Sequence, residues 1–226
     1  MCLPAPSSGT VLCDTDPGTF PPLEEAPVPQ LQTDSRPATA RRSTSADIAL
    51  IAVFAALIAA LGLAPPIYAF GNAVPITLQT LGVMLAGSIL GAKRGTLAVL
   101  TFLALVAVGL PLLSGGRGGL GVFAGPSAGY LVGFVFGAYV TGLLTRRFGE
   151  RDGATSSFLG TLAATVIGGV LVVYAFGVPV QAWRLGLPLP TVAVGAGLFV
   201  VGDLAKAVIS TLITRGVRRA GVRLPD

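Results

Sequence analysis

Residues 48–64, IALIAVFAALIAALGLA, form an uninterrupted run of apolar residues and glycine without a single charge. Five more apolar stretches follow, at residues 76–92, 95–113, 127–145, 157–176 and 191–214. Each stretch has about 17 to 24 residues, and a helix needs roughly 20 to cross the hydrocarbon core of a bilayer. Helices pair all their backbone groups internally, whereas an open sheet leaves unpaired groups in lipid. We therefore predict an all-α, polytopic membrane protein with six transmembrane helices.

The overall composition agrees with a membrane domain. Of 226 residues, 53% are hydrophobic and 11% are charged, whereas about 25% are charged in ordinary soluble domains. The 31 glycines suit helices that approach closely in lipid. The formal charge of +5 lies in short clusters between apolar runs, so it does not indicate a nucleic-acid-binding surface.

Three regions follow from this pattern. Residues 1–46 contain eight prolines and no helical or strand period, so we expect a disordered cytoplasmic tail. It lacks the basic start of a secretory signal. Residues 47–215 form the six-helix membrane domain, and residues 216–226 form a basic cytoplasmic tail.

The distribution of positive charge predicts the orientation in a cell membrane. Twelve of the 15 basic residues fall in the first tail, the loops after the second and fourth stretches, and the last tail: Arg36, Arg41, Arg42, Lys93, Arg94, Arg146, Arg147, Arg151, Arg215, Arg218, Arg219 and Arg223. The opposite side has only Arg117 and Arg184. Because positive charge concentrates on cytoplasmic loops, we expect both termini in the cytoplasm of this multi-pass protein.

Several missing motifs narrow the function. The chain has no G-x-x-x-x-G-K-[ST] phosphate loop, so it carries no Walker ATPase. It has no histidine, and its two cysteines lie in the first tail, so we expect no Ser-His nucleophile, no metal site and no bound cofactor. We predict that the protein is not an enzyme.

Two charged residues in the last apolar stretch are candidates for ligand binding. Asp203 and Lys206 are three residues apart, so they share one helix face. Ionisable groups at membrane depth are costly and often functional. They could form a polar clamp for a ligand, or an internal salt bridge that only fixes helix packing.

The residues before the second helix form another candidate. Pro75 suits a first helical turn, so we expect the helix to begin there, with Thr77 and Gln79 in its first turns near the outer surface. Both side chains could contact a ligand. The alternative explains them equally well: Thr77 occurs there only because it favours the start of a helix, and Gln79 only because it faces solvent.

A glycine-rich segment at residues 114–130, SGGRGGLGVFAGPSAGY, is the most unusual in the chain. Its G-x-G-x-x-G pattern lacks the flanking strand and helix of a dinucleotide site. Because glycine lets backbone pass close to a ligand, Ser114 and Gly116 are candidate contacts. A flexible external hairpin is the equal alternative.

Small residues recur every fourth position in three helices, which is typical of close helix contacts. The three ridges are Ala52, Ala56 and Ala60; Gly87, Gly91 and Gly95; and Gly129, Gly133 and Gly137. We expect packing within the bundle by default. Trp183 and Arg184 are expected in an external loop, with the tryptophan as a membrane anchor.

Three motifs in order resemble the BioY family, the biotin-specific S components of energy-coupling factor (ECF) transporters. They are VPITLQTL at residues 74–81, the segment at 115–134 with GPSAGY at its centre, and GDLAK at residues 202–206. The similarity extends over residues 47–215. It implies a six-helix protein that captures biotin from outside.

The resemblance also implies roles for particular residues and partners. Asp203 and Lys206 match the family's ligand-binding acid and base, while Thr77, Gln79 and Tyr130 match positions near the pocket. The ridge of Ala52, Ala56 and Ala60 matches the contact with a transmembrane coupling subunit, which works with two cytoplasmic ATPases. The alternative function is a self-sufficient secondary transporter or channel for another small solute.

Overall fold

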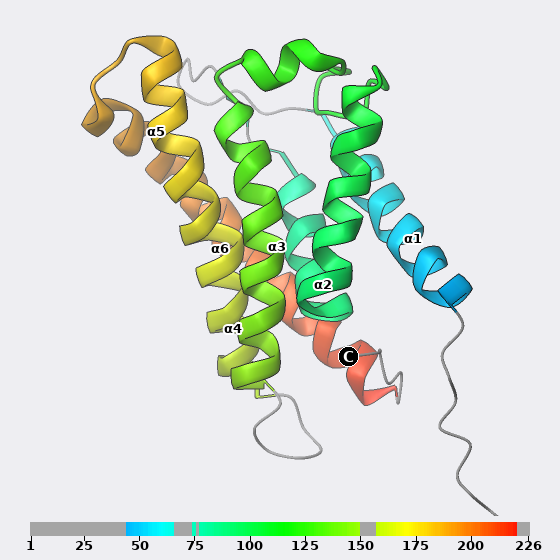
Figure 1. Cartoon of the computed structure of the whole chain (residues 1–226). Helices are drawn as coiled ribbons and strands as arrows, with labels where there is room; N and C mark the ends of the chain where they lie inside the picture. The colour runs from blue at the N-terminus through cyan, green and yellow to red at the C-terminus, as the bar shows by residue number, and fades with distance from the viewer. Residues whose placement is uncertain (1–43, 66–73, 76, 150–156, 221–226) are drawn as a thin grey trace, which may run out of the picture. The chain divides into compact units, whose positions relative to one another are not determined.

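The computed structural model describes residues 44–65, 74–75, 77–149 and 157–220 (Figure 1). The predicted disordered tail therefore lies almost entirely outside the described residues. The elements are the α-helices α1 (Thr44–Gly62), α2 (Gln79–Ala107), α3 (Ala128–Gly149), α4 (Phe158–Val166), α5 (Val173–Leu185) and α6 (Leu189–Arg219), the 3₁₀ helix η1 (Leu120–Ala124) and the π-helix η2 (Ile167–Val172). In these ranges the only β-type pairing is an isolated bridge between Leu113 and Arg117, so the all-α prediction is confirmed.

Long apolar helices dominate the described part of the chain. Four helical runs there are long and apolar enough to cross a membrane: α1, α2, Ala128–Phe148 of α3, and the continuous run Phe158–Leu185. A fifth is α6, counted as one span although its two parts, Leu189–Gly197 and Phe199–Arg219, meet at 47°. The predicted count of six differs because two of the apolar stretches fall largely in one element, α2.

Helix α2 is not straight, because it folds back on itself at Gly91. The backbone of Gly91 has φ 81° and ψ −180°, which is not helical, and a positive φ favours glycine. A Cβ added at Gly95 would lie within 3.0 Å of Ala86 and Gly87, although eight residues of continuous helix span about 12 Å. The two halves of α2 on either side of Gly91 therefore lie side by side, as Figure 1 shows in teal and green.

The fold-back also changes the predicted glycine ridge of α2. Gly87, Gly91 and Gly95 do not form one continuous helix face, because the helix reverses at the middle residue. Gly87 still permits a close helix contact, since an added Cβ there would collide with Ala138 and Thr141 of α3. The four-residue spacing of glycines therefore does not distinguish a continuous packing face from a helix that reverses direction.

Two helices begin at positions that differ from the expected ones. Helix α1 begins at Thr44 rather than after residue 46, so the last residues of the predicted tail are helical. Helix α2 begins at Gln79 instead of Pro75, which leaves Thr77 ahead of the helix. The described residues directly before α2, at 74–75 and 77–78, are not helical, and Pro75 is buried.

The last helices are longer than expected. Trp183 and Arg184 lie in the last turn of α5 and not in a loop, although Trp183 is exposed. Helix α6 continues to Arg219, so the predicted basic tail begins as helix. Polar and basic residues can continue a helix beyond its apolar run, so the apolar run alone underestimates the helix length.

The glycine ridge on α3 packs inside the bundle, as predicted. Added Cβ atoms at Gly129, Gly133 and Gly137 would meet the backbone of α5 or η2 at positions 176, 173 and 168 respectively. Glycine at these three positions therefore lets α3 approach the neighbouring helix closely.

The ridge on α1 differs, because its side chains point away from the bundle. Ala52, Ala56 and Ala60 are all exposed, whereas Ala55 and Ile58 on the other face are buried. This leaves a strip of small residues open for contact with lipid or another chain.

Two polar contacts show that parts of α1, α2 and α6 lie at the same end of the helix bundle. Arg94 forms a salt bridge of 2.9 Å with Asp47 at the start of α1. Arg218, near the end of α6, donates a hydrogen bond of 3.2 Å to the backbone oxygen of Ser88. The start of α1, the fold-back of α2 and the end of α6 therefore lie together.

Candidate functional site

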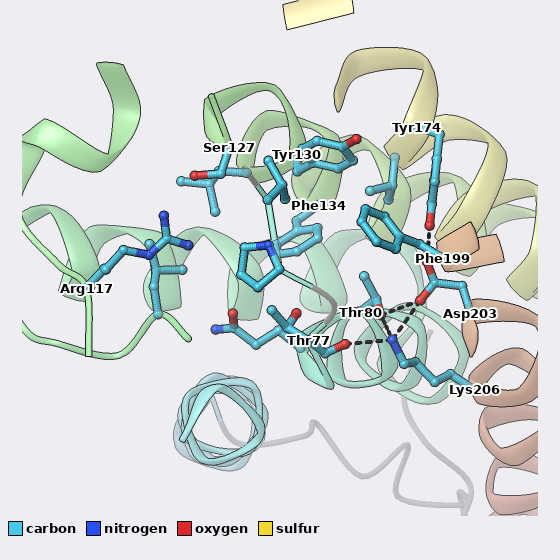
Figure 2. Close-up of a pocket in the computed structure, with 16 residues that line it drawn as sticks. Thr77, Thr80, Arg117, Ser127, Tyr130, Phe134, Tyr174, Phe199, Asp203 and Lys206 are labelled. Carbon is cyan, nitrogen blue, oxygen red and sulfur yellow. Dashed lines mark hydrogen bonds and ion pairs between the residues drawn. The ribbon is translucent and has the colours of Figure 1, made fainter. Parts of the chain in front are cut away.

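A cavity of about 60 Å³ lies between the helices (Figure 2). Its walls come from the segment before α2, the first turn of α2, the segment between α2 and α3, and helices α3, α5 and α6. The lining residues are Val74, Pro75, Thr77, Gln79, Thr80, Leu113, Arg117, Ser127, Tyr130, Leu131, Phe134, Val173, Tyr174, Phe199, Asp203 and Lys206. Apolar and aromatic walls with a few polar groups are typical of small-molecule sites.

Asp203 and Lys206 form a buried salt bridge at one end of this cavity. Lys206 Nζ lies 2.8 Å from Asp203 Oδ1, and the side chains of Lys206 and Asp203 are 8% and 5% exposed. The Thr80 hydroxyl donates to Asp203 Oδ1 at 2.9 Å. The internal salt bridge that the spacing allowed is therefore present, and it lies in the cavity wall.

In this pair, Asp203 has a free hydrogen-bond acceptor position, whereas all three donors of Lys206 are used. Lys206 has three donors, and it donates to Asp203, to the Thr77 backbone oxygen at 2.6 Å and to Thr80 Oγ1 at 3.1 Å. Asp203 Oδ2 accepts one bond, from the Tyr174 hydroxyl at 2.5 Å. A carboxylate has about four acceptor positions, so one remains on Oδ2.

An aromatic wall continues from the pair along α5 and α3. The rings of Tyr174 and Tyr130 meet edge to face, with centroids 6.0 Å apart. The Tyr130 hydroxyl donates to the buried Gln181 Oε1 at 2.9 Å. An added Cβ at Gly177 would collide with the Tyr130 ring, so the glycine makes room for this side chain.

The π-helix η2 sets the direction in which α5 presents its side chains. A π-turn contains one extra residue, because its hydrogen bonds run from i to i+5. One residue corresponds to about 100° of rotation in an α-helix. Without η2, Val173 and Tyr174 would be turned by that angle away from their present positions in the cavity wall. Such turns are frequent at functional sites.

The opposite end of the cavity is formed by Arg117 and Ser127 (Figure 2). Arg117 Nε donates to the Ser114 backbone oxygen at 3.2 Å. Ser127 is buried, and its hydroxyl has no hydrogen-bond partner among the described residues. Arg117 brings a positive charge to this end.

Five of the predicted site residues line the cavity: Asp203, Lys206, Gln79, Thr77 and Tyr130. Gln79 is 2% exposed, and its Nε2 donates to the Leu112 backbone oxygen at 3.2 Å. The alternative that Gln79 is solvated is therefore wrong.

Ser114 and Gly116 do not line this cavity. Ser114 is buried, and its backbone oxygen accepts a hydrogen bond from Arg117. Gly116 lines a second concavity, which shares Arg117 and Ser127 with this cavity. The segment is not a plain hairpin, because it contains η1.

Sequence reasoning missed five polar or aromatic lining residues. They are Thr80, Arg117, Ser127, Tyr174 and Phe199. Thr80 and Ser127 lie inside the quoted motifs. Arg117 is one of only two basic residues on the predicted external side of the membrane, and this isolation could have marked it as a candidate for binding an acidic ligand. Nothing in the local sequence singles out Tyr174 or Phe199, since their directions depend on η2 and on the bend in α6.

Comparisons with known proteins agree on one group. The model of the BioY family matches residues 34–223. A protein from Rhizobium etli named biotin transporter BioY is 52% identical over 173 residues, covering 76% of this chain and 92% of the relative. One of the same name from Rhodobacter capsulatus is 46% identical over 181 residues, with the same coverage.

A solved structure is also similar. The crystal structure of the S component for biotin from an ECF-type ABC transporter matches with a TM-score of 0.74 and 33% sequence identity. The match covers 80% of this chain and 95% of that chain.

Proposed function

This chain belongs to the BioY family, and from that premise we propose that it is the biotin-binding component of a vitamin uptake transporter in the cell membrane. The observation that carries the proposal is the buried pair of Asp203 and Lys206 in the wall of a largely apolar cavity. Its relatives are named transporters, in agreement with a protein that is not an enzyme.

The hydrogen-bond count supports one orientation of biotin. The ureido head of biotin has two N–H donors, and Asp203 Oδ2 has an open acceptor position beside the Tyr174 hydroxyl oxygen. Lys206 has no donor left for the ligand. The head therefore binds at Asp203 and Tyr174, while Lys206 holds the carboxylate of Asp203 in place.

The carboxylate of biotin then lies at the other end, near Arg117. The Nε atom of Arg117 donates to the protein, and the terminal nitrogens of a guanidinium group bind carboxylates through parallel N–H bonds. The cavity of about 60 Å³ is smaller than the roughly 300–1,000 Å³ of typical ligand sites, so its walls move apart on binding.

We infer six membrane crossings with both termini in the cytoplasm. The two parts of α2 are about 18 and 24 Å long at 1.5 Å per residue, and residues 77–78, directly before Gln79, add to the first crossing. Non-helical backbone is tolerated at this depth where it lines a cavity. The start of α1 and the end of α6 lie on the same side of the bundle, which supports an even number of membrane crossings. The basic residues near both ends support a cytoplasmic location for the two termini.

Energy for uptake comes from partners, since the sequence has no ATPase motif of its own. We propose that a transmembrane ECF coupling subunit packs on the exposed ridge of Ala52, Ala56 and Ala60, and that two cytoplasmic ATPases drive it. Small residues let helix backbones approach closely in lipid.

Titration of the purified protein tests the ligand. We expect tight binding of biotin and no comparable binding of thiamine or riboflavin. Asp203→Asn should weaken biotin binding at least tenfold, or about 1.4 kcal/mol. Asp47→Asn is the matched control, because Asp47 pairs with Arg94 away from the cavity. Equal biotin affinity in the two variants would show that Asp203 does not contribute to the binding site.

A neutral analogue tests the orientation. Biotin amide keeps the ureido head but lacks the negative charge, so the wild-type protein should bind it more weakly than biotin. In Arg117→Gln this difference should disappear. If it disappears in Lys206→Met instead, the ligand binds in the reverse orientation.

Uptake into vesicles tests the partner. Ala56→Trp should leave biotin binding unchanged but block uptake by the assembled transporter, because the indole keeps the coupling subunit away from α1. Ala193→Trp, the same change at an exposed alanine of α6, is the control and should leave uptake intact. Uptake by this chain alone, without ATPases, would contradict the need for partners.

A further inference from the structure

A second concavity lies beside the ligand cavity, and we call it the outer bowl. Its lining residues are Gly116, Arg117, Gly118, Gly121, Val122, Gly125 and Ser127, and its volume is about 410 Å³. Arg117 and Ser127 line both the bowl and the inner cavity. The two spaces therefore meet at these two side chains.

At the boundary between the two spaces, Ser127 and Arg117 have hydrogen-bonding groups that are available to a ligand. Ser127 is 7% exposed, and its hydroxyl has no partner within the described ranges. Buried polar groups are normally paired, so an unpaired hydroxyl here favours a ligand. Arg117 adds N–H groups on its two terminal nitrogens, which can bind a carboxylate in bidentate fashion.

The walls of the bowl are open to a ligand. Cβ atoms added at Gly116 or Gly121 would meet no atom within 4 Å, and four of the seven lining residues are glycines. Glycine lets a ligand approach the backbone closely. The bowl also falls within the roughly 300–1,000 Å³ of small-molecule sites, unlike the inner cavity.

We propose that the outer bowl is an entry site for an amphiphilic carboxylate, which here means biotin and so rests on the proposed function. The carboxylate binds first to Arg117 and Ser127 while the ring lies in the bowl. The ring then turns into the inner cavity toward Asp203, and the carboxylate stays at the boundary. Ligand leaves by the same route.

An entry site and a bound-state contact differ in kinetics. Obstructing an entry route slows association and dissociation by the same factor, because both directions cross the same barrier, and the dissociation constant does not change. Removing a contact of the bound state speeds dissociation instead.

A single cysteine tests the bowl after the protein has folded. Gly121 is exposed and has an ordinary φ, so Gly121→Cys in a Cys2→Ser, Cys13→Ser background can be labelled with a bulky maleimide. The control is Gly216→Cys, also exposed and with no atom within 4 Å of an added Cβ. Stopped-flow binding of biotin is measured before and after labelling.

We expect labelling at Gly121→Cys to slow association and dissociation at least tenfold each, with the dissociation constant within twofold. The control should not change. Unchanged rates would show that biotin enters elsewhere, and faster dissociation alone would make the bowl part of the bound site. Either result overturns the entry site, whereas absence of biotin binding before labelling would overturn the proposed function.

Discussion

The charge pair in the cavity wall should make a large contribution that depends on both partners being present. Lys206→Met removes the ammonium but keeps an unbranched chain of similar length. Asp203 would then be a buried carboxylate held only by the hydroxyls of Thr80 and Tyr174. Removing one partner of a buried ion pair costs about 3–5 kcal/mol.

The double variant separates charge from packing. In Asp203→Asn, Lys206→Met both charges disappear, so no buried charge is left unpaired. Replacing a buried pair by well-packed hydrophobic residues of similar volume is often neutral for stability; the methionine at position 206 would be such a residue, and the asparagine at position 203 could still accept from the hydroxyls of Thr80 and Tyr174. We therefore expect the double variant to recover most of the stability that either single variant loses, without recovering biotin binding.

Thermal unfolding in detergent, without ligand, measures the effect. About 1 kcal/mol shifts Tm by roughly 2–4 °C in a chain of 150–250 residues, so each single variant should lose about 6–20 °C. The double variant should lie within a few degrees of wild type. A double variant no more stable than the worse single one would refute the reasoning.

Three other changes test neighbouring contacts. Tyr174→Phe removes a hydrogen bond to a carboxylate, worth about 1.5–3 kcal/mol, and should weaken biotin binding about tenfold or more by titration; Tyr139→Phe, on an exposed residue, should not. Gly177→Ala collides with a cavity tyrosine and should lower both Tm and biotin affinity, whereas Gly216→Ala, with open space around it, should do neither. Ser88→Ala loses an interhelical hydroxyl contact of 2.8 Å and should lower the unfolding free energy by about 0.5–1.5 kcal/mol, measured by thermal unfolding, with biotin affinity unchanged.

Much of the fold and the centre of the site could be predicted because their signals are local. Apolar runs of sufficient length identify the helices, and the spacing of Asp203 and Lys206 places them on one helix face. The role of Thr77 was not predictable in the same way, since Thr77 and the other described residues directly before α2 are not helical. Its backbone oxygen, and not its side chain, contacts Lys206.

The rest of the site depends on geometry that local sequence does not specify. Tyr174 reaches Asp203 because η2 rotates α5 by about 100° relative to α4. Glycines permit η2 to pack closely: an added Cβ at Gly168 would collide with α3, and one at Gly169 would collide with a methionine of α2. Such a pair of glycines in a helix has many explanations, so a π-turn is not predictable from it.

The position of the ion pair is better explained by ligand binding than by stability. Hydroxyl contacts already join the helices elsewhere, as between Ser88 and Thr214 at 2.8 Å, and they avoid the desolvation of full charges. A buried ion pair often gives no more stability than apolar side chains of similar size. Here, however, Lys206 holds the Asp203 side chain in place beside Tyr174, in the wall of a cavity. That arrangement is costly for a structural contact and suited to an N–H donor that arrives and leaves.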